Sequence, residues 1–176
     1  EQYAFVAEKK YADSDYASKQ ADKFLDELLR VGTTTAMVFG TVHADSVNSF
    51  FTSCKNRNLR MVCGKVMMDR NAPAFLQDTP QTSYDESKSL IETWHNKDRL
   101  RYAVTPRFAP TSSEHQLELA GQLLREYPDV YLHTHLSETE NEVAWVRKLY
   151  PKRDNYVDVY DKAGLLGSKS IFAHCI

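Results

Sequence analysis

Short apolar runs alternate along this chain with longer stretches whose apolar residues recur at helical spacing. Runs of about four to eight residues are typical of strands, and a period near 3.6 is typical of amphipathic helices. The predicted strands cover residues 33–39, 60–68, 101–105, 130–135 and 170–175. The predicted helices cover residues 15–30, 45–58, 83–96, 113–127, 139–150 and 156–163. This order predicts an α/β fold with a parallel sheet and right-handed crossovers.

Local signals refine two of these helices and the loop before one of them. Ser83 with Glu86, and Ser113 with Gln116, have the spacing of a capping box, so each pair predicts a helix start. The segment 69–81 contains two prolines and is predicted to be a loop.

Two architectures satisfy this alternation. One is an open doubly wound sheet, and the other is a consecutive arc of a (β/α)₈ barrel, which needs about eight strands and roughly 250 residues to close. The chain has 176 residues and neither a GxGxxG nor a GK[ST] segment, so the usual marker of nucleotide-binding open sheets is missing. Periodicity alone does not choose between the two.

Charge, hydropathy and cysteine content exclude several classes of protein. A net charge of −2 gives no overall attraction to nucleic acid or to an anionic membrane, and no apolar run approaches the roughly 20 residues of a membrane helix. The odd cysteine count, with no close pair, predicts neither a disulfide framework nor a CxxC metal site, and Cys54, Cys63 and Cys175 are expected to be small buried apolar residues. We therefore expect a cytoplasmic protein.

Polar side chains stand at the carboxyl ends of three predicted strands, where both architectures bind ligands. They are Arg107 after the third strand, His133, His135 and Glu138 at the fourth, and His174 at the fifth. His133 and His135 face the same side of their strand, because side chains two apart do so. His135 and His174 can converge on one metal ion if their strands are neighbours, and imidazole suits zinc or ferrous iron.

The remaining histidines are weaker candidates. His133 is interpreted as a hydrogen-bonded interior residue that supports the site. His95 and His115 are expected to be exposed on helices, and His43 follows the first strand and could line the pocket. Catalytic zinc usually takes three protein ligands. The ligands beyond His135 and His174 must therefore come from His43, His133, a carboxylate or residues outside this chain.

A plainer interpretation of the same residues remains open. In this interpretation His135 and His174 are core histidines, Arg107 is a cation of a surface loop and Phe108 is a core anchor. The chain would then be a non-catalytic α/β module.

Six segments together resemble a known family. They are VGTTT at 31–35, GKVMMD at 64–69, TPRF at 105–108, HTHLSE at 133–138, VYDK at 159–162 and FAHC at 172–175. On these motifs the chain resembles the guanine deaminases of the amidohydrolase superfamily, most closely the bacterial type. The resemblance extends over essentially the whole chain. The Pro-Arg-Phe segment is the more particular to guanine deaminases, whereas the His-Leu-Ser-Glu element occurs widely in the superfamily.

The resemblance implies an incomplete (β/α)₈ TIM-type barrel made of strands two to six of the family fold. Residues 1–176 would form part of a metal-dependent hydrolase barrel domain. The first strand with its HxH pair, the last strands with an Asp ligand, and the β-sandwich of the family are absent from the sequence. The chain is therefore expected to be a segment of a longer protein and inactive alone.

The resemblance also implies a reaction and its residues. The reaction is the zinc-dependent hydrolytic deamination of guanine to xanthine and ammonia, a step of purine catabolism. His135 and His174 would bind one zinc ion, or iron in its place, Glu138 would be the catalytic proton shuttle, and Arg107 and Phe108 would bind the purine. The complete protein would be a homodimer with a small-molecule substrate and neither a nucleic-acid nor a membrane partner. The alternative within the superfamily is another deaminase, or a chlorohydrolase, that acts on a related heterocycle.

Overall fold

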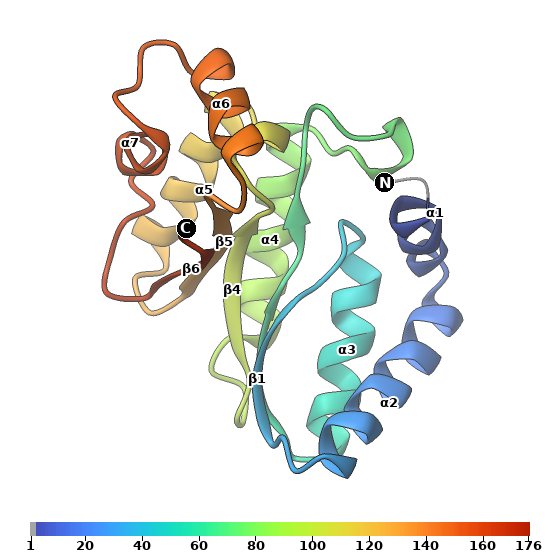
Figure 1. The fold of residues 1–176 in the computed structure, drawn as a ribbon. Coiled ribbons are helices and arrows are strands. Elements are labelled where there is room, and N and C mark those ends of the chain that lie inside the picture. Colours follow the sequence, from blue (N-terminus) through green and yellow to red (C-terminus); the bar gives the residue numbers. More distant parts are fainter. Residues whose placement is uncertain (1–2) are drawn as a thin grey trace.

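The computed structural model describes residues 3–176, and its centre is one curled parallel sheet (Figure 1). The six strands are β1 (Thr35–Phe39), β2 (Arg60–Gly64), β3 (Val66–Met67), β4 (Arg101–Pro106), β5 (Tyr131–Leu136) and β6 (Ser170–His174). They lie side by side in the order β1-β2-β4-β5-β6, with β3 paired to β4. Every pair is parallel.

Helices separate the strands along the chain. They are α1 (Ala4–Lys9), α2 (Ser14–Arg30), α3 (Ala44–Asn56), α4 (Pro80–Trp94), α5 (Glu114–Glu126), α6 (Glu140–Leu149) and α7 (Tyr156–Lys162). Three short 3₁₀ turns supplement them at Lys10–Ala12, Ala74–Leu76 and Ala109–Thr111. Between residues 3 and 176, no helix has the length and apolar character needed to cross a membrane.

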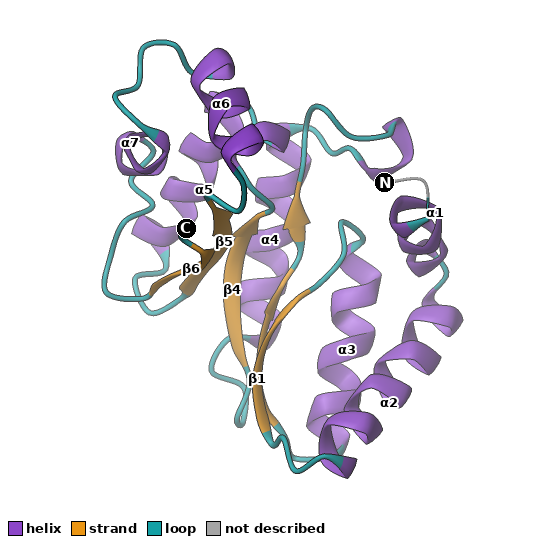
Figure 2. Cartoon of the chain, viewed as in Figure 1, coloured by secondary structure: helices purple, strands orange, loops and turns teal. Residues whose placement is uncertain are grey.

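The strand order decides between the two architectures. In a doubly wound sheet the strand order reverses at a switch point and helices cover both faces. Here the strands follow one another in chain order, and α3, α4 and α5 pack in succession on one face (Figure 2). Consecutive neighbours of this kind form an arc of a barrel. The predicted incomplete TIM-type barrel is therefore confirmed.

The main core lies between this sheet and the helices that cover it. The ring of Phe51 on α3 stacks on Trp94 of α4 at 5.5 Å, and Leu25 of α2 and Tyr102 of β4 are fully buried in the same cluster. Full burial of an aromatic or aliphatic side chain contributes about 1.5–3 kcal/mol. This core holds the strands in register and so fixes where their carboxyl ends lie.

Most predicted elements agree with the structure, and two boundaries do not. The strand predicted over 60–68 is divided, because the backbone N–H of Lys65 donates to the Tyr102 hydroxyl (3.1 Å) between β2 and β3. The helix predicted to start at Ser83 starts at Pro80, and Thr79 forms its capping box with Thr82. Ser83 cannot cap because it is buried inside this helix.

Three further outcomes concern local contacts. Ser113 caps α5 as predicted, by accepting a hydrogen bond from the Gln116 N–H, but the Gln116 side chain donates to Ser83 rather than back to Ser113. Cys54 and Cys63 are buried, and burial raises the pKa of the Cys54 thiol to about 12. Cys175 is exposed, so the expectation that all three cysteines are buried was wrong.

Candidate active site

The carboxyl ends of β4, β5 and β6 bring the predicted site residues together. In the register of β5 with β6, His135 lies opposite Ala173 and Leu136 opposite His174. The backbone N–H of His135 donates to the carbonyl oxygen of Arg107, which directly follows β4. The predicted adjacency of the last two strands is therefore confirmed, and their ends meet the Arg107 loop.

His135 has one ring nitrogen committed and one free. Its Nδ1 lies 2.8 Å from the carbonyl oxygen of Arg107. Since a carbonyl oxygen only accepts hydrogen bonds, this contact requires a proton on Nδ1, and in the neutral ring Nε2 then carries the lone pair. The His135 ring is stacked between Phe39, at 4.3 Å, and His174, at 5.5 Å. An imidazole whose Nδ1–H is held by a backbone carbonyl has the arrangement usual for metal ligands.

His174, at the end of β6, contacts Glu138, which follows β5. Nε2 of His174 lies 3.5 Å from Oε2 of Glu138. Their backbone is unusual, because His174 has a φ of 75° and Ser137, next to Glu138, a φ of 52°. Left-handed conformations cost non-glycine residues of order 1 kcal/mol and are concentrated at functional sites. The chain thus turns sharply at both strand ends, where it presents these two side chains.

A cavity of about 230 Å³ joins Glu138 and His135 to the Arg107 loop. Its lining includes Arg107, Phe108, His135, Glu138 and Trp145. The Phe108 ring is edge-on to both His135 (6.4 Å) and Trp145 (6.3 Å). A guanidinium, an aromatic ring, an imidazole and a carboxylate therefore face one space, which is suited to a flat, polar ligand.

The side chains at this site are of the types that bind zinc, but they do not form a complete set of ligands. The Nε2 lone pair of His135, the His174 imidazole and the Glu138 carboxylate are all suitable donors. Within residues 3–176, however, no group of three or more His, Cys, Asp or Glu side chains is placed to hold a metal ion.

The other histidines depart from their predictions in two cases. His133 is buried against the Phe39 ring (3.8 Å), and its Nδ1 has no hydrogen-bond partner in the described part of the chain, contrary to the expected hydrogen-bonded residue. Burial lowers its pKa to about 4, so it is neutral at pH 7. His95 was expected to be exposed, yet its side chain is 8% exposed and its Nδ1 accepts a hydrogen bond from the Tyr102 N–H. His115 is exposed as predicted.

His43 lies at the carboxyl end of β1, in a different space from His135. It lines a cavity of about 300 Å³ together with Asp45, Asp78 and Glu86. Burial lowers its pKa, so it favours the neutral form. The structure does not bring His43 into the cavity that holds Arg107 and Glu138.

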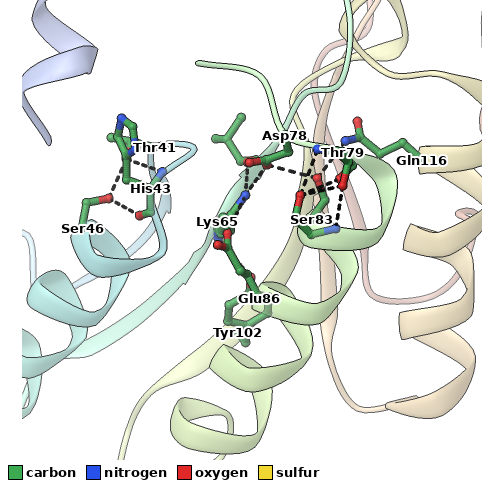
Figure 3. Close-up of polar contacts among 12 residues, drawn as sticks. Thr41, His43, Ser46, Lys65, Asp78, Thr79, Ser83, Glu86, Tyr102 and Gln116 are labelled. Atoms are coloured by element: carbon green, nitrogen blue, oxygen red, sulfur yellow. Dashed lines mark hydrogen bonds and ion pairs between the residues drawn. The ribbon is translucent and has the colours of Figure 1, made fainter. Parts of the chain in front are cut away.

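Sequence reasoning missed a buried ion-pair cluster around Lys65 (Figure 3). The Lys65 side chain is 0% exposed, forms a salt bridge with Asp78 and lies 3.3 Å from Glu86. The Ser83 hydroxyl donates to Asp78, and Gln116 in turn donates to Ser83. A lysine inside the apolar run GKVMM was the available signal, since a fully buried lysine requires a partner.

The loop anchored by this cluster reaches the Arg107 loop. Asp69 accepts hydrogen bonds from the backbone N–H and the hydroxyl of Ser113. Arg70 donates to the carbonyl of Ala109 (3.1 Å), and Asn71 donates to that of Pro110 (2.7 Å). Residues 69–71 thus fix the position of residues 109–113, which follow Arg107 and Phe108.

The sequence pattern of the amidohydrolase family matches residues 4–176 of this chain. The guanine deaminase of Escherichia coli is 53% identical over 174 residues, which are 99% of this chain and 40% of that protein. A solved structure of E. coli guanine deaminase superposes with a TM-score of 0.97 over 98% of this chain and 40% of its own, at 54% identity.

A second solved structure, guanine deaminase from C. acetobutylicum with guanine bound in its active site, is 34% identical and has a TM-score of 0.95 over 99% of this chain and 42% of its own. The chain therefore spans about two fifths of the length of the relatives it matches.

Proposed function

The chain belongs to the amidohydrolase family, and from this premise we propose that the complete protein containing it is a zinc-dependent guanine deaminase. The reaction would be guanine plus water to xanthine plus ammonia, a step of purine catabolism in the cytoplasm. The observation that carries the proposal is the cavity shared by Arg107, Phe108, His135 and Glu138. The 53% identity to E. coli guanine deaminase supports the same substrate.

His135 and His174 would hold the zinc ion in this proposal. The hydrogen bond from His135 Nδ1–H to the Arg107 carbonyl supports the role, because it directs the free Nε2 away from that loop. The same bond links a metal ligand to the backbone of the proposed purine-binding residue. When bound, zinc supplies Lewis-acid activation of water at neutral pH.

Glu138 would move the protons of the reaction. Its carboxylate would accept one proton from the attacking water and pass it to the purine ring nitrogen N3, and would then pass the second proton, from the new hydroxyl at C2, to the leaving amine. Water would thus add at C2, the carbon that carries the amine, and ammonia would leave. The placement of Glu138 beside His174 and in the cavity with Arg107 supports this role.

Arg107 and Phe108 would recognise the base. The guanidinium is a rigid fork of N–H donors, which suits the O6 and N7 acceptors of guanine. Phe108 would offer its ring to the flat face or edge of the purine. A 6-oxo purine would therefore be preferred over related heterocycles without that oxygen.

We further propose that residues 1–176 are strands two to six of the complete barrel. The strand with an HxH pair and the strand with an Asp ligand would come from outside this chain, and the complete protein would be a homodimer. Sedimentation of the complete protein tests the dimer independently of its activity.

The function is tested with Glu138→Gln in the complete protein. The variant should keep its zinc and lose about 10²–10⁴-fold in kcat on guanine, the usual contribution of a general acid–base group. Zinc content is measured by elemental analysis and turnover by the appearance of xanthine. Undiminished turnover in a zinc-loaded variant would contradict the role of Glu138. A zinc-loaded wild-type protein that leaves guanine unchanged would contradict the proposed function.

A further inference from the structure

Helix α1 brings a carboxylate to Arg107 from the far end of the chain. Oε2 of Glu8 lies 3.3 Å from Nη1 of Arg107, across 99 residues of sequence. Figure 1 shows α1 beside the loops at the carboxyl ends of the strands. Neither α1 nor Glu8 was predicted from the sequence.

The Arg107 guanidinium is held from two directions by α1. Glu8 pairs with one of its nitrogens, and the Phe5 ring lies 5.5 Å from its central carbon. Within residues 3–176, Glu8 is the only ion-pair partner of Arg107. Because an arginine side chain has many rotamers, the direction of its fork depends on such contacts.

Glu8 leaves most of the guanidinium available to a ligand. Arg107 has five N–H donors, and the single contact with Glu8 engages one nitrogen. Arg107 lines the cavity that contains Glu138, and it also lines an adjoining cavity of about 380 Å³ that contains Glu8. His135 lines both cavities. Glu8 and Glu138 therefore line two different cavities, and Arg107 lines both.

Simple packing gives no reason for a carboxylate at this place. The second oxygen of Glu8, Oε1, is buried and has no hydrogen-bond partner in the described chain. Leaving a buried carboxylate oxygen unpaired costs free energy. Helix α1 has no fully buried residue, and Phe5, which packs partly buried against a small apolar cluster, accounts for the position of the helix but not for a carboxylate at position 8. The ion pair with Arg107 is the polar contact that Glu8 gains at this position.

We propose that Glu8 is a positioning residue, which orients the Arg107 guanidinium toward the 6-oxo oxygen of the purine. The inference rests on the proposed function and extends it to a helix about 100 residues away in sequence. It predicts a loss of discrimination for the oxo group when the charge of Glu8 is removed.

The test is steady-state kinetics of Glu8→Gln in the complete protein, with guanine and with 2-aminopurine, which lacks the oxo group. KM for guanine should rise about tenfold, kcat should stay within about threefold, and kcat/KM for 2-aminopurine should change less than about twofold, as expected for one lost charge-assisted contact. Glu8→Asp keeps the charge and should recover part of the loss. Zinc content should equal that of the wild type in both variants.

Glu114→Gln is the matched control, because Glu114 also pairs with an arginine, Arg153, at 3.3 Å, but on the exposed surface. It should leave all kinetic constants unchanged. Equal losses on guanine and 2-aminopurine in Glu8→Gln would reduce Glu8 to a structural role and overturn the inference, and so would an unchanged KM for guanine. Both outcomes presuppose a wild type that deaminates guanine, so they leave the proposed function standing.

Discussion

Two ion pairs lie near the carboxyl edge of the same sheet and differ in how fully they are satisfied. Lys65 has a side chain that is 0% exposed, and its ammonium contacts Asp78, Glu86 and the carbonyl of Val66. Arg107 is 30% exposed and has one carboxylate partner, Glu8. The first pair has three oxygens for three N–H donors, whereas the second has one partner for five donors.

This difference indicates a structural role for Lys65 and a ligand-binding role for Arg107. A saturated, buried cation has no donor left for a ligand, so the Lys65 cluster can only hold the loop that runs to Asp78. An unsaturated cation beside a cavity has donors to offer, so Arg107 can bind. Loss of the Lys65 pair should therefore affect stability, and loss of the Arg107 pair should affect substrate constants.

The largest expected effect is that of Lys65→Met. Removing one partner of a buried pair leaves Asp78 without its counter-charge, which costs about 3–5 kcal/mol of unfolding free energy. Burial raises the pKa of Asp78 although Lys65 acts in the opposite direction, so without Lys65 the charged carboxylate would lose its main compensation for burial. Equilibrium urea denaturation of the complete protein measures the loss.

Lys162→Met is its control, because Lys162 has a 55% exposed side chain and pairs with Asp158 at the surface. This variant should leave the denaturation midpoint almost unchanged. Equal midpoints for the two lysine variants would mean that the buried cluster is not a support.

The uncharged hydroxyl of Tyr160 offers a third case, in which buried hydrogen bonds stabilise the site without an ion pair. The Tyr160 hydroxyl is buried, donates to the carbonyl of His135 (2.7 Å) and accepts from the N–H of Ala109 (3.0 Å). Tyr160→Phe leaves both backbone groups unpaired, which should cost about 1–3 kcal/mol of unfolding free energy. The loss should lie below that of Lys65→Met in the same denaturation experiment.

Tyr131→Phe serves as the control for the missing hydroxyl, since Tyr131 is only partly buried and its hydroxyl makes no protein hydrogen bond within residues 3–176. Its effect should stay within about 0.5 kcal/mol. If Tyr160→Phe were equally mild, the hydrogen bonds of the Tyr160 hydroxyl would not contribute to the stability of this region.

The smallest effect is a pH dependence at His95, which contacts Tyr102, the residue whose hydroxyl accepts a hydrogen bond from the Lys65 N–H. Its Nδ1 accepts a hydrogen bond from the N–H of Tyr102, and burial lowers its pKa. Above pH about 6.5 the imidazole is neutral in the folded and unfolded chain. Below that pH the unfolded chain takes up the proton first, so the free energy of unfolding falls as the pH falls.

His95→Asn keeps an acceptor and cannot titrate, so its stability should fall less than that of the wild type between pH 7 and 5. His115→Asn, at an exposed position, should follow the wild type. Denaturant midpoints across this range measure both. A wild-type slope in His95→Asn would exclude His95 as its source.

The sequence predicted the architecture better than the parts that stabilise the site. Strand and helix periods, and residues such as His135 and Arg107 at strand ends, follow from local patterns. Helix α1 does not follow from such patterns, because it is six residues long, has no side-chain cap and contains no fully buried residue. The orientation of Lys65 depends on Asp78 and Glu86, which periodicity does not connect to it.

Two histidines show the same limit. An HxH on a strand predicts that both rings face one side, but not that the Nδ1 of His133 lies without a partner against Phe39. A polar helix end suggested an exposed His95, whereas the turn into β4 buries its ring under Tyr102. Contacts between residues distant in sequence decide such cases.

The most direct test is a crystal structure of the complete protein with zinc and xanthine. We expect zinc on Nε2 of His135 and on His174. We also expect the Arg107 guanidinium to lie between the Glu8 carboxylate and the 6-oxo oxygen of the purine. A purine bound away from Arg107, or a zinc ion that does not touch His135, would contradict these roles.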